Sequence, residues 1–300
     1  MNKIICIGSS NTDMVVRSER LPRPGESVIG GNFIMAGGGK GANQAVAIAR
    51  MGHKVIFSAA VGNDIFGSEA IARYEQFGVN TSYIVRKTTP SGIALIMVDA
   101  AAQNSISVAL GANTELSASD VMPALDLIEP GDIVLLQLEI PMETVDFCVA
   151  TAAAKGARVI LNPAPAAEVS KETLSKLYLI TPNQTEADTL TGIEVHDKES
   201  ACAAAEALRA KGVDKVIITM GGDGALLDDG GEFEMIPAFR VNAVDTTAAG
   251  DVYNGALCAA LAEGQSLREA MIFGSKASAI SVTRIGAQPS IPTREEVDNF

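Results

Sequence analysis

A glycine-rich segment in this 300-residue chain, Ala36-Gly37-Gly38-Gly39-Lys40-Gly41-Ala42-Asn43-Gln44, has the residue types of a ligand-binding loop. Glycines let the backbone approach a ligand closely, and the segment directly precedes a predicted helix. A P-loop needs other residues at the positions of Ile34 and Gly41, and a dinucleotide fingerprint would lie about thirty residues earlier, after the first strand. Lys40 and Asn43 place a cation and an amide at the start of the helix, which favours a polyhydroxyl ligand over a plain tight turn.

A second segment, Val244-Asp245-Thr246-Thr247-Ala248-Ala249-Gly250-Asp251, combines small residues with a carboxylate where a helix is predicted to start, near Ala248. The free N–H groups of a first helical turn, strengthened by the helix dipole, form an anion-binding site. Asp251 falls in that turn. It is either a carboxylate placed to suit the dipole or a general base beside a bound phosphate, and the residues alone leave both interpretations open.

Two further segments follow predicted strands. In Thr181-Pro182-Asn183-Gln184-Thr185-Glu186, the pair Asn183 and Glu186 has the spacing of a helix capping box, and it would also suit support of Mg²⁺ through water. The segment Thr219-Met220-Gly221-Gly222-Asp223-Gly224 is either a hairpin turn or a nucleotide-binding loop at a strand end.

Polar residues at other element ends complete the candidate set. Asn11 and Asp13 follow the first strand and Glu139 follows a later one, so each would bind sugar hydroxyls or close an Asx turn. The irregular segment from Ser281 to Ser290 would turn several carbonyls toward one point and bind a cation.

Hydrophobic periodicity predicts the elements that must position these residues. From residue 117 onward strands and helices alternate, which indicates a parallel sheet covered by helices on both faces, with ligands at the carboxyl ends of the strands. The expected strands are 3–8, 54–60, 132–138, 158–161, 177–180 and 216–220, and the expected helices are 40–51, 66–77, 142–155, 198–211, 248–262 and 267–283.

Shorter β-type runs occur at 14–16, 27–30 and 32–36, and a hairpin is expected from 92–99 and 105–110. Together they predict a small separate sheet. We therefore expect one α/β domain over residues 1–300, with three layers and a β appendage built from about 13–36 and 92–110.

Composition excludes several classes of protein. Hydrophobic residues make up 47% and charged residues 20%, which excludes a disordered chain, and the net charge of −13 argues against nucleic acid as a partner. The four cysteines are far apart without a CxxC motif, and there are only two histidines, which argues against a disulfide framework and a multi-histidine zinc site. Neither a signal peptide nor a membrane-spanning stretch is evident, so we expect a cytoplasmic protein without a membrane partner.

Taken together and in this order, these segments resemble the ribokinase-like carbohydrate and nucleoside kinase family over nearly the whole chain. Residues 38–45 look like its N-terminal signature, residues 245–251 look like its C-terminal signature, and Asn183-Gln184-Thr185-Glu186 matches its Asn-x-x-Glu motif. The resemblance implies a parallel-sheet fold with a β lid and ATP-dependent phosphorylation of D-ribose at its 5-hydroxyl.

The resemblance also implies roles for individual residues. Asp251 would be the base, and the amides around Ala249, Gly250 and Asp251 would stabilise charge on the transferred phosphoryl group. The sugar would be held by Asn11, Asp13, Gly39, Lys40, Asn43 and Glu139. The nucleotide site would include Asn183, Thr219, Gly221, Gly222, Gly224, Gly250 and Ser275, and Ser275 stands where relatives often have His or Asn.

By the same resemblance, Mg²⁺ would bridge the phosphates, with Glu186 acting through water. A monovalent cation, usually K⁺, would lie next to the anion hole, at a site formed mostly by carbonyls of Asp245, Thr247, Ser281, Arg284, Gly286 and Ser290. The small sheet would be the lid, and two lids would pair in a homodimer.

Three alternatives remain at this stage. A 2-deoxyribose kinase is the nearest, but its close relatives tend to carry an apolar residue at position 11, where this chain has Asn11. A fructose or nucleoside kinase is the second, and the Lys-Gly-Ala-Asn-Gln run at 40–44 favours neither. A non-catalytic sugar or nucleotide sensor on the same fold is the third, and the carboxylate at Asp251 favours catalysis over it.

Overall fold

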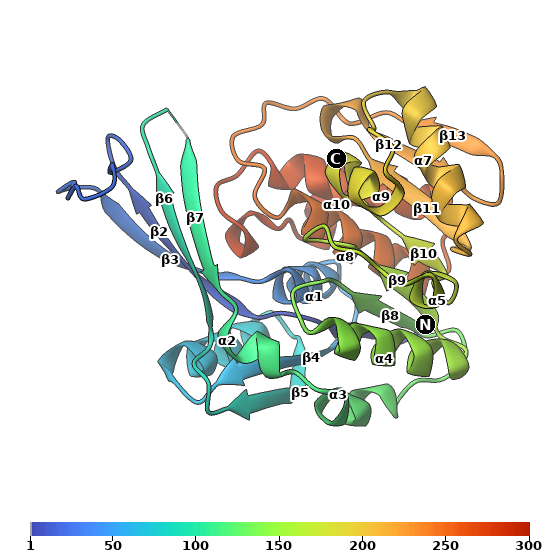
Figure 1. Ribbon diagram of the computed structural model, residues 1–300, viewed down its shortest axis with the longest axis horizontal. Helices are drawn as coiled ribbons and strands as arrows, with labels where there is room; N and C mark the ends of the chain where they lie inside the picture. Colours follow the sequence, from blue (N-terminus) through green and yellow to red (C-terminus); the bar gives the residue numbers. More distant parts are fainter. Residues whose placement is uncertain (1, 102) are drawn as a thin grey trace.

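The computed structural model describes residues 2–101 and 103–300, which form two β-sheets and the helices around them (Figure 1). The large sheet has nine strands in the order β13-β12-β11-β10-β9-β8-β1-β4-β5 over the described residues. Their bounds are β1 Ile4–Ile7, β4 Val55–Gly62, β5 Asn80–Lys87, β8 Ile133–Leu136, β9 Arg158–Leu161, β10 Leu179–Ile180, β11 Lys215–Thr219, β12 Ala225–Asp228 and β13 Phe233–Ile236.

From β11 to β5 each strand of the large sheet is parallel to its neighbour, which confirms the predicted parallel sheet. The sheet is mixed only at one edge, because β12 is antiparallel to β11 and β13 is antiparallel to β12. The sequence patterns did not predict β5, β12 or β13. The turn at Gly221–Asp223 joins β11 to β12, so its interpretation as a hairpin turn is confirmed.

Helices cover both faces of the large sheet and create two apolar layers, as alternate strand residues require. Ile4 and Cys6 of β1 lie in one layer, while Ile5 and Ile7 lie in the other. The first layer includes α1 Lys40–Arg50, α2 Ile65–Gln76, α8 Ala249–Ala262, α9 Leu267–Ser281 and α10 Arg294–Asp298, and the second includes α3 Ala118–Leu125, α4 Met142–Ala154, α5 Lys171–Leu174, α6 Gln184–Thr191 and α7 Lys198–Ala210. The three-layer prediction is thereby confirmed.

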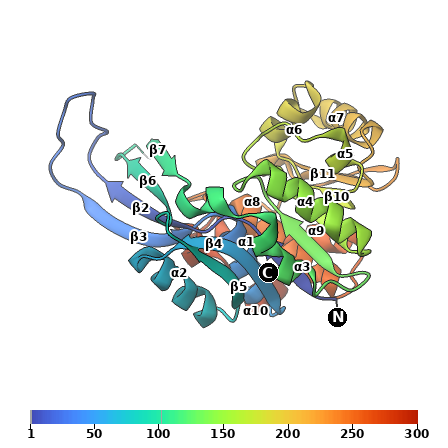
Figure 2. The ribbon, with the colours of Figure 1, turned by 60° about the horizontal axis from the view of Figure 1, so that its bottom comes forward.

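The second sheet has four strands in the order β3-β2-β6-β7 and stands away from the main body (Figures 1 and 2). These strands are β2 Asn11–Arg17, β3 Asn32–Gly38, β6 Gly92–Val98 and β7 Asn104–Ala109. The separate small sheet and its hairpin are therefore confirmed. The predicted strand at 27–30 is wrong, because that stretch belongs to an exposed loop that ends in Gly30 and Gly31, both with positive φ.

Two helices begin where the ligand-binding segments lie. Helix α1 starts at Lys40, directly after Gly39, whose φ of 88° suits glycine, and a Cβ there would lie 2.8 Å from the Asn11 backbone nitrogen. Helix α8 starts at Ala249, one residue later than expected. Across the described part of the chain, none of the helices has the length and apolar character needed to cross a bilayer.

Candidate active site

A cavity of about 210 Å³ lies at the carboxyl ends of the parallel strands, between the first turns of α1 and α8. It brings together seven of the residues proposed from the sequence: Lys40, Asn183, Glu186, Thr219, Ala249, Gly250 and Asp251. The other lining residues are Asn162, Ala164, Thr181, Thr246, Ala248 and Asn254. Segments that are far apart in the chain thus meet at the edge where open α/β sheets bind ligands.

Asp251 is the most constrained carboxylate of this cavity. It lies in the first turn of α8, is only 5% exposed, and accepts hydrogen bonds from Asn43 Nδ2 at 2.9 Å and Gln44 Nε2 at 3.0 Å. Burial raises the pKa of Asp251, while Lys40 and the two amides oppose the rise. A carboxylate with a raised pKa, held by two amides and facing a cavity, is suited to accept a proton.

Lys40 is the central cation of the site. Burial opposes its charge, but Asp251, Glu139 and Glu186 outweigh burial and raise the pKa of Lys40, which keeps it protonated. Glu139 is fixed in turn, because its Oε2 accepts hydrogen bonds from Ser9 Oγ at 2.5 Å and the Lys40 backbone nitrogen at 3.0 Å.

Asn11 and Asp13 lie on β2, next to the glycine-rich segment of β3. Asn11 Oδ1 accepts a hydrogen bond of 2.8 Å from Asn113 Nδ2, and the Asn11 amide nitrogen, which has no hydrogen-bond partner among the described residues, is available as a donor. Burial raises the pKa of Asp13 to about 6, with further contributions from Glu139 and Asp251. A Cβ at Gly38 would lie 2.2 Å from Asp13 Oδ1, so the glycine makes room for that carboxylate.

The backbone at the start of α8 has an unusual conformation. Ala248, its N-cap, has a φ of 60°, the left-handed region that residues other than glycine rarely adopt. A Cβ at Gly250 would meet nothing within 4 Å, so this part of the first turn faces open space. The first-turn N–H groups therefore lie beside a cavity, in the arrangement that binds anions at helix N-termini.

Asn183 and Glu186 both form a capping box and line the cavity. The Glu186 carboxylate accepts from the Asn183 backbone nitrogen at 2.9 Å, and Asn183 Oδ1 accepts from the Glu186 backbone nitrogen at 2.9 Å. Glu186 is buried, and burial raises its pKa. This geometry is thus compatible with both interpretations of the motif, the capping box and the support of Mg²⁺ through water.

The remaining nucleotide candidates do not all line the cavity. Thr219 lines it, whereas Gly221, Gly222 and Gly224 form the turn that follows β11 and do not line it. Ser275 lies on α9 and does not line the cavity either. Helix α9 nevertheless contacts the start of α8, because Ser278 Oγ donates to the Ala249 carbonyl at 3.1 Å.

The two segments proposed for a monovalent cation lie side by side. Asp245 Oδ1 accepts from Thr247 Oγ1 at 2.6 Å, and Asp245 Oδ2 accepts from the Gly286 backbone nitrogen at 2.9 Å. Ser281 and Ser290 are buried, and their hydroxyls donate to the carbonyls of Ser278 and Ala287. The Arg284 guanidinium is a cation without an acceptor atom and is paired with Glu296 at 2.5 Å, so Arg284 could contribute only its backbone carbonyl.

Sequence reasoning named Asn43 as a sugar ligand and did not foresee that Asn43 and Gln44 hold the Asp251 carboxylate. Gln44 was quoted within its motif without a role, yet its Nε2 also donates to Asn162 Oδ1 at 2.9 Å and its Oε1 accepts from Gln137 Nε2 at 2.5 Å. Asn162 directly follows strand β9 and Gln137 directly follows strand β8. A polar residue directly after a buried strand was the sequence signal that could have identified them as site residues. Asn113 and Gln288 gave no comparable signal.

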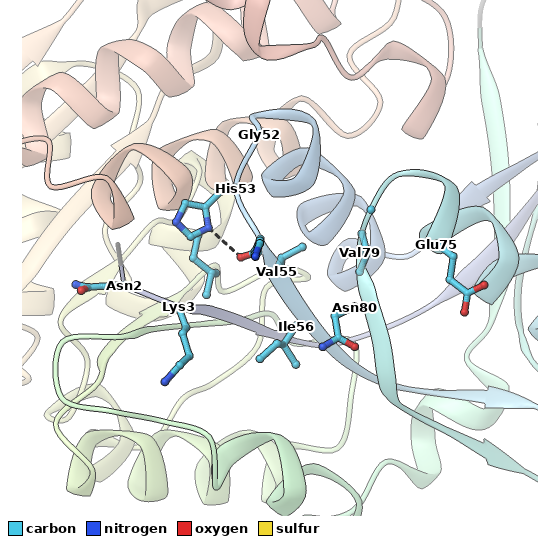
Figure 3. A pocket seen from close by; sticks show the side chains of 12 residues that line it. Asn2, Lys3, Gly52, His53, Val55, Ile56, Glu75, Val79 and Asn80 are labelled. Atoms are coloured by element: carbon cyan, nitrogen blue, oxygen red, sulfur yellow. Dashed lines mark hydrogen bonds between the residues drawn. The ribbon is translucent and has the colours of Figure 1, made fainter.

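A larger cavity, of about 830 Å³, lies at the opposite edge of the sheet (Figure 3). It is lined by residues at the amino ends of β1, β4 and β5, including Ile4, Val55 and Asn80. His53 lies against it, and its Nδ1 contacts the Lys54 carbonyl at 2.9 Å. The catalytic candidates named above do not line this cavity, so its size does not make it the active site.

Comparison with known proteins identifies the family of this chain. The model of the pfkB family carbohydrate kinases matches residues 1–294. The chain is 44% identical to the ribokinase of Haemophilus influenzae, over 98% of this chain and 96% of that one, and 38% identical to the deoxyribokinase of Salmonella typhi, over 99% and 98%.

Among solved structures, ribokinase of Arabidopsis thaliana, complexed with ribose and ATP, superposes with a TM-score of 0.91 at 30% identity, covering 99% of this chain and 98% of that one. A family match over nearly the full length, together with relatives above 30% identity, establishes the relationship. This chain belongs to the pfkB family of carbohydrate kinases.

Proposed function

We propose that this carbohydrate kinase transfers the γ-phosphoryl group of ATP to the 5-hydroxyl of D-ribose, giving D-ribose 5-phosphate and ADP. The observation that carries the proposal is Asp251, a buried carboxylate held by Asn43 and Gln44 in the first turn of α8. The relatives named ribokinase support ribose as the sugar.

In the proposed reaction, the ribose 5-oxygen attacks the γ-phosphorus while its proton passes to the Asp251 carboxylate. The bond between the γ-phosphorus and the β–γ bridging oxygen breaks, and ADP leaves. The first-turn N–H groups around Ala249, Gly250 and Asp251 stabilise the charge on the transferred group, and Lys40 adds a fixed cation beside it. Positioning and electrostatics thus account for the catalysis.

Six residues are proposed to hold the sugar: Asn11, Asp13, Gly39, Lys40, Asn43 and Glu139. The main alternative substrate is 2-deoxy-D-ribose, since the Salmonella relative is named deoxyribokinase. The free amide nitrogen of Asn11 favours ribose, because it would otherwise lose a partner that the 2-hydroxyl provides.

We further propose that Asn183, Thr219, Gly221, Gly222, Gly224, Gly250 and Ser275 contact ATP. Mg²⁺ bound with ATP would supply charge neutralisation, and the buried carboxylate of Glu186 at the cavity wall would suit contact with its waters. The paired segments 245–247 and 281–290 suit a K⁺ site, with Asp245, Thr247, Ser281, Arg284, Gly286 and Ser290 as its residues.

The small sheet is proposed to be a lid over a single domain of residues 1–300, and to form a homodimer with a second copy. One face of this sheet is apolar and exposed: Met35 and Leu95 both pair with Met14, and Phe33 and Met97 both pair with Val16. Residues paired across a sheet share a face, whereas Asp13 alternates to the other face. The four cysteines are unpaired, which suits the cytoplasm.

The test measures ADP release from Mg-ATP with D-ribose, 2-deoxy-D-ribose, D-fructose and adenosine, each in K⁺ and in Na⁺. We expect the highest kcat/KM with ribose and a higher rate in K⁺. A preference for another sugar would replace ribose in the proposal, and equal rates in both salts would remove the K⁺ site from it.

The same assay applied to Asp251→Asn tests the base. We expect kcat to fall about 10²–10⁴-fold while ribose binding, measured by calorimetry, is retained. Asp228→Asn is the matched control, because Asp228 is 1% exposed and lies at the end of β12, outside the cavity. An Asp251→Asn variant with wild-type kcat would contradict the mechanism, and a wild type that binds ribose without turnover would be a sensor.

A further inference from the structure

Gln288 is a buried amide that the proposed reaction does not use. It begins the short helix η3 (Gln288–Ser290), at the end of the segment proposed for the monovalent cation, and is 2% exposed. Its Nε2 donates to Asn43 Oδ1 at 3.3 Å, across 245 positions of sequence. Gln288 therefore touches α1 at the residue next to the base.

Asn43 links Gln288 to Asp251. Its Nδ2 donates to Asp251 Oδ2 at 2.9 Å. An amide has one accepting end and one donating end, and an ionised carboxylate can only accept. Asn43 must therefore direct its nitrogen toward Asp251, and a donor at its oxygen fixes that orientation. Gln288 supplies this donor.

The other end of the Gln288 amide faces β3. Gln288 Oε1 has no hydrogen-bond partner among the described residues, although it is buried. A Cβ at Gly37 would lie 2.2 Å from this oxygen and 2.9 Å from Gln288 Nε2. The amide thus lies between the glycine strand of the small sheet and Asn43, in space that a side chain at Gly37 would take up.

We infer that Gln288 is a positioning residue that holds Asn43 in the orientation in which it donates to Asp251. Through this contact the segment 281–290 and strand β3 are connected to the catalytic base. The inference rests on the proposed function only in that Asp251 is the base, and it holds for any sugar that the enzyme phosphorylates.

The first test is Gln288→Met, which keeps the length of the side chain but removes both polar ends. We expect kcat to fall about tenfold, since small displacements of catalytic groups cost up to about 10²-fold, while the KM for ATP changes less than about twofold. Gln184→Met is the matched control, because Gln184 Nε2 also donates one hydrogen bond, to the Val195 carbonyl at 3.1 Å, outside the site. Its kcat should remain within about twofold of wild type.

A double-mutant cycle with Asn43→Ala tests the route of the effect. If Gln288 acts through Asn43, Gln288→Met causes no further loss of kcat in the Asn43→Ala background. Equal fractional losses in both backgrounds would overturn the inference. Gly37→Ala provides a second variant, because its Cβ would displace the same amide, and its kcat should fall as in Gln288→Met. Unchanged kcat in both Gln288→Met and Gly37→Ala would also overturn it.

The outcome can be separated from failure of the proposed function. If another sugar is the substrate, the cycle is run with that sugar and keeps its meaning. If no sugar is phosphorylated, the cycle is run on the melting temperature instead, where Gln288→Met should lower the value in wild type but not in Asn43→Ala. Additive changes in melting temperature would then overturn the inference.

Discussion

At the scale of single residues, the site concentrates carboxylates around one cation. Asp251, Glu139 and Glu186 all act on Lys40, and Glu139 and Asp251 both act on Asp13. Holding several carboxylates in a partly buried site raises the pKa of some of them. The same arrangement raises the pKa of Asp13 to about 6 and also raises the pKa of Asp251 and Glu186, the kind of shift that acid–base chemistry uses.

Asp13 gives the first prediction, which concerns pH. Burial raises its pKa to about 6, so the kcat/KM for ribose should fall as pH decreases through about 6, because the protonated carboxyl is a weaker acceptor for a sugar hydroxyl. In Asp13→Asn the pH dependence near 6 should disappear, and kcat/KM should be about 10–100-fold lower at pH 8, the cost of one charge-assisted hydrogen bond.

Stability should respond with the opposite sign. The folded-state pKa of about 6 lies above the ordinary value of 3.8, so the folded protein binds this proton more tightly. The contribution of Asp13 to the free energy of unfolding is therefore present below pH 3.8 and lost as pH rises through about 6.

Asp188→Asn on α6 is the control for the activity prediction, and its kcat/KM should still fall as pH decreases through about 6. If kcat/KM of Asp13→Asn also falls as pH decreases through about 6, a group other than Asp13 causes that pH dependence.

At the scale of elements, the strongly periodic segments were predictable and the short ones were not. Helices α1, α2, α4, α7, α8 and α9 carry continuous helical patterns and were found within two residues at each end. Strands β5 and β13 are only partly buried, so neither shows the continuous apolar run that marked the four-residue strands β8 and β9. Strand β12 is buried, but it follows β11 through a short glycine turn that local pattern left open between a hairpin and a ligand loop. Their positions depend on partner strands that a local pattern does not contain.

The site shows the same division. Asp251, Lys40 and Asn183 were predictable because each lies at the start of a helix beside small or capping residues. Gln44 and Gln288 were not, because their roles depend on partners 207 and 245 positions away in the chain. Local spacing identifies helix ends, whereas a buried amide network appears only when the layers are packed.

The N-cap of α8 gives the second prediction. Ala248 has a φ of 60°, and the left-handed region costs an ordinary residue about 1–2 kcal/mol that glycine does not incur. Ala248→Gly should therefore raise the free energy of unfolding in urea by about 1 kcal/mol, with part of the gain offset by the greater entropy of the unfolded chain.

Ala203→Gly is the control with opposite sign. Ala203 is exposed in the interior of α7, where glycine should lower the free energy of unfolding by about 1 kcal/mol. If Ala248→Gly lowers stability as Ala203→Gly does, the left-handed turn before α8 is not strained. If it raises stability, this strain is a cost that the native sequence retains beside the proposed active site.

At the scale of the whole molecule, the small sheet is the part that exposes several large apolar side chains close together. The face that carries Met14 exposes Phe33, Met35, Leu95 and Met97, and the face that carries Asp13 exposes Ile34, Ile106 and Val108, whereas single exposed apolar residues elsewhere are ordinary. A contiguous apolar patch of this kind marks an interaction surface, and a two-fold dimer covers the same face on both copies. The face that carries Asp13 would remain directed toward the sugar.

Met35→Lys gives the third prediction. Wild type should sediment as a dimer at micromolar concentration, and a lysine on the shared face should place two unpaired charges in the interface and weaken the dimer at least about tenfold. Met122→Lys on α3 is the matched control, since Met122 is 38% exposed and Met35 is 42% exposed, and it should leave sedimentation unchanged. A wild-type monomer would contradict pairing through the small sheet, and a Met35→Lys dimer as tight as wild type would place the interface on another surface.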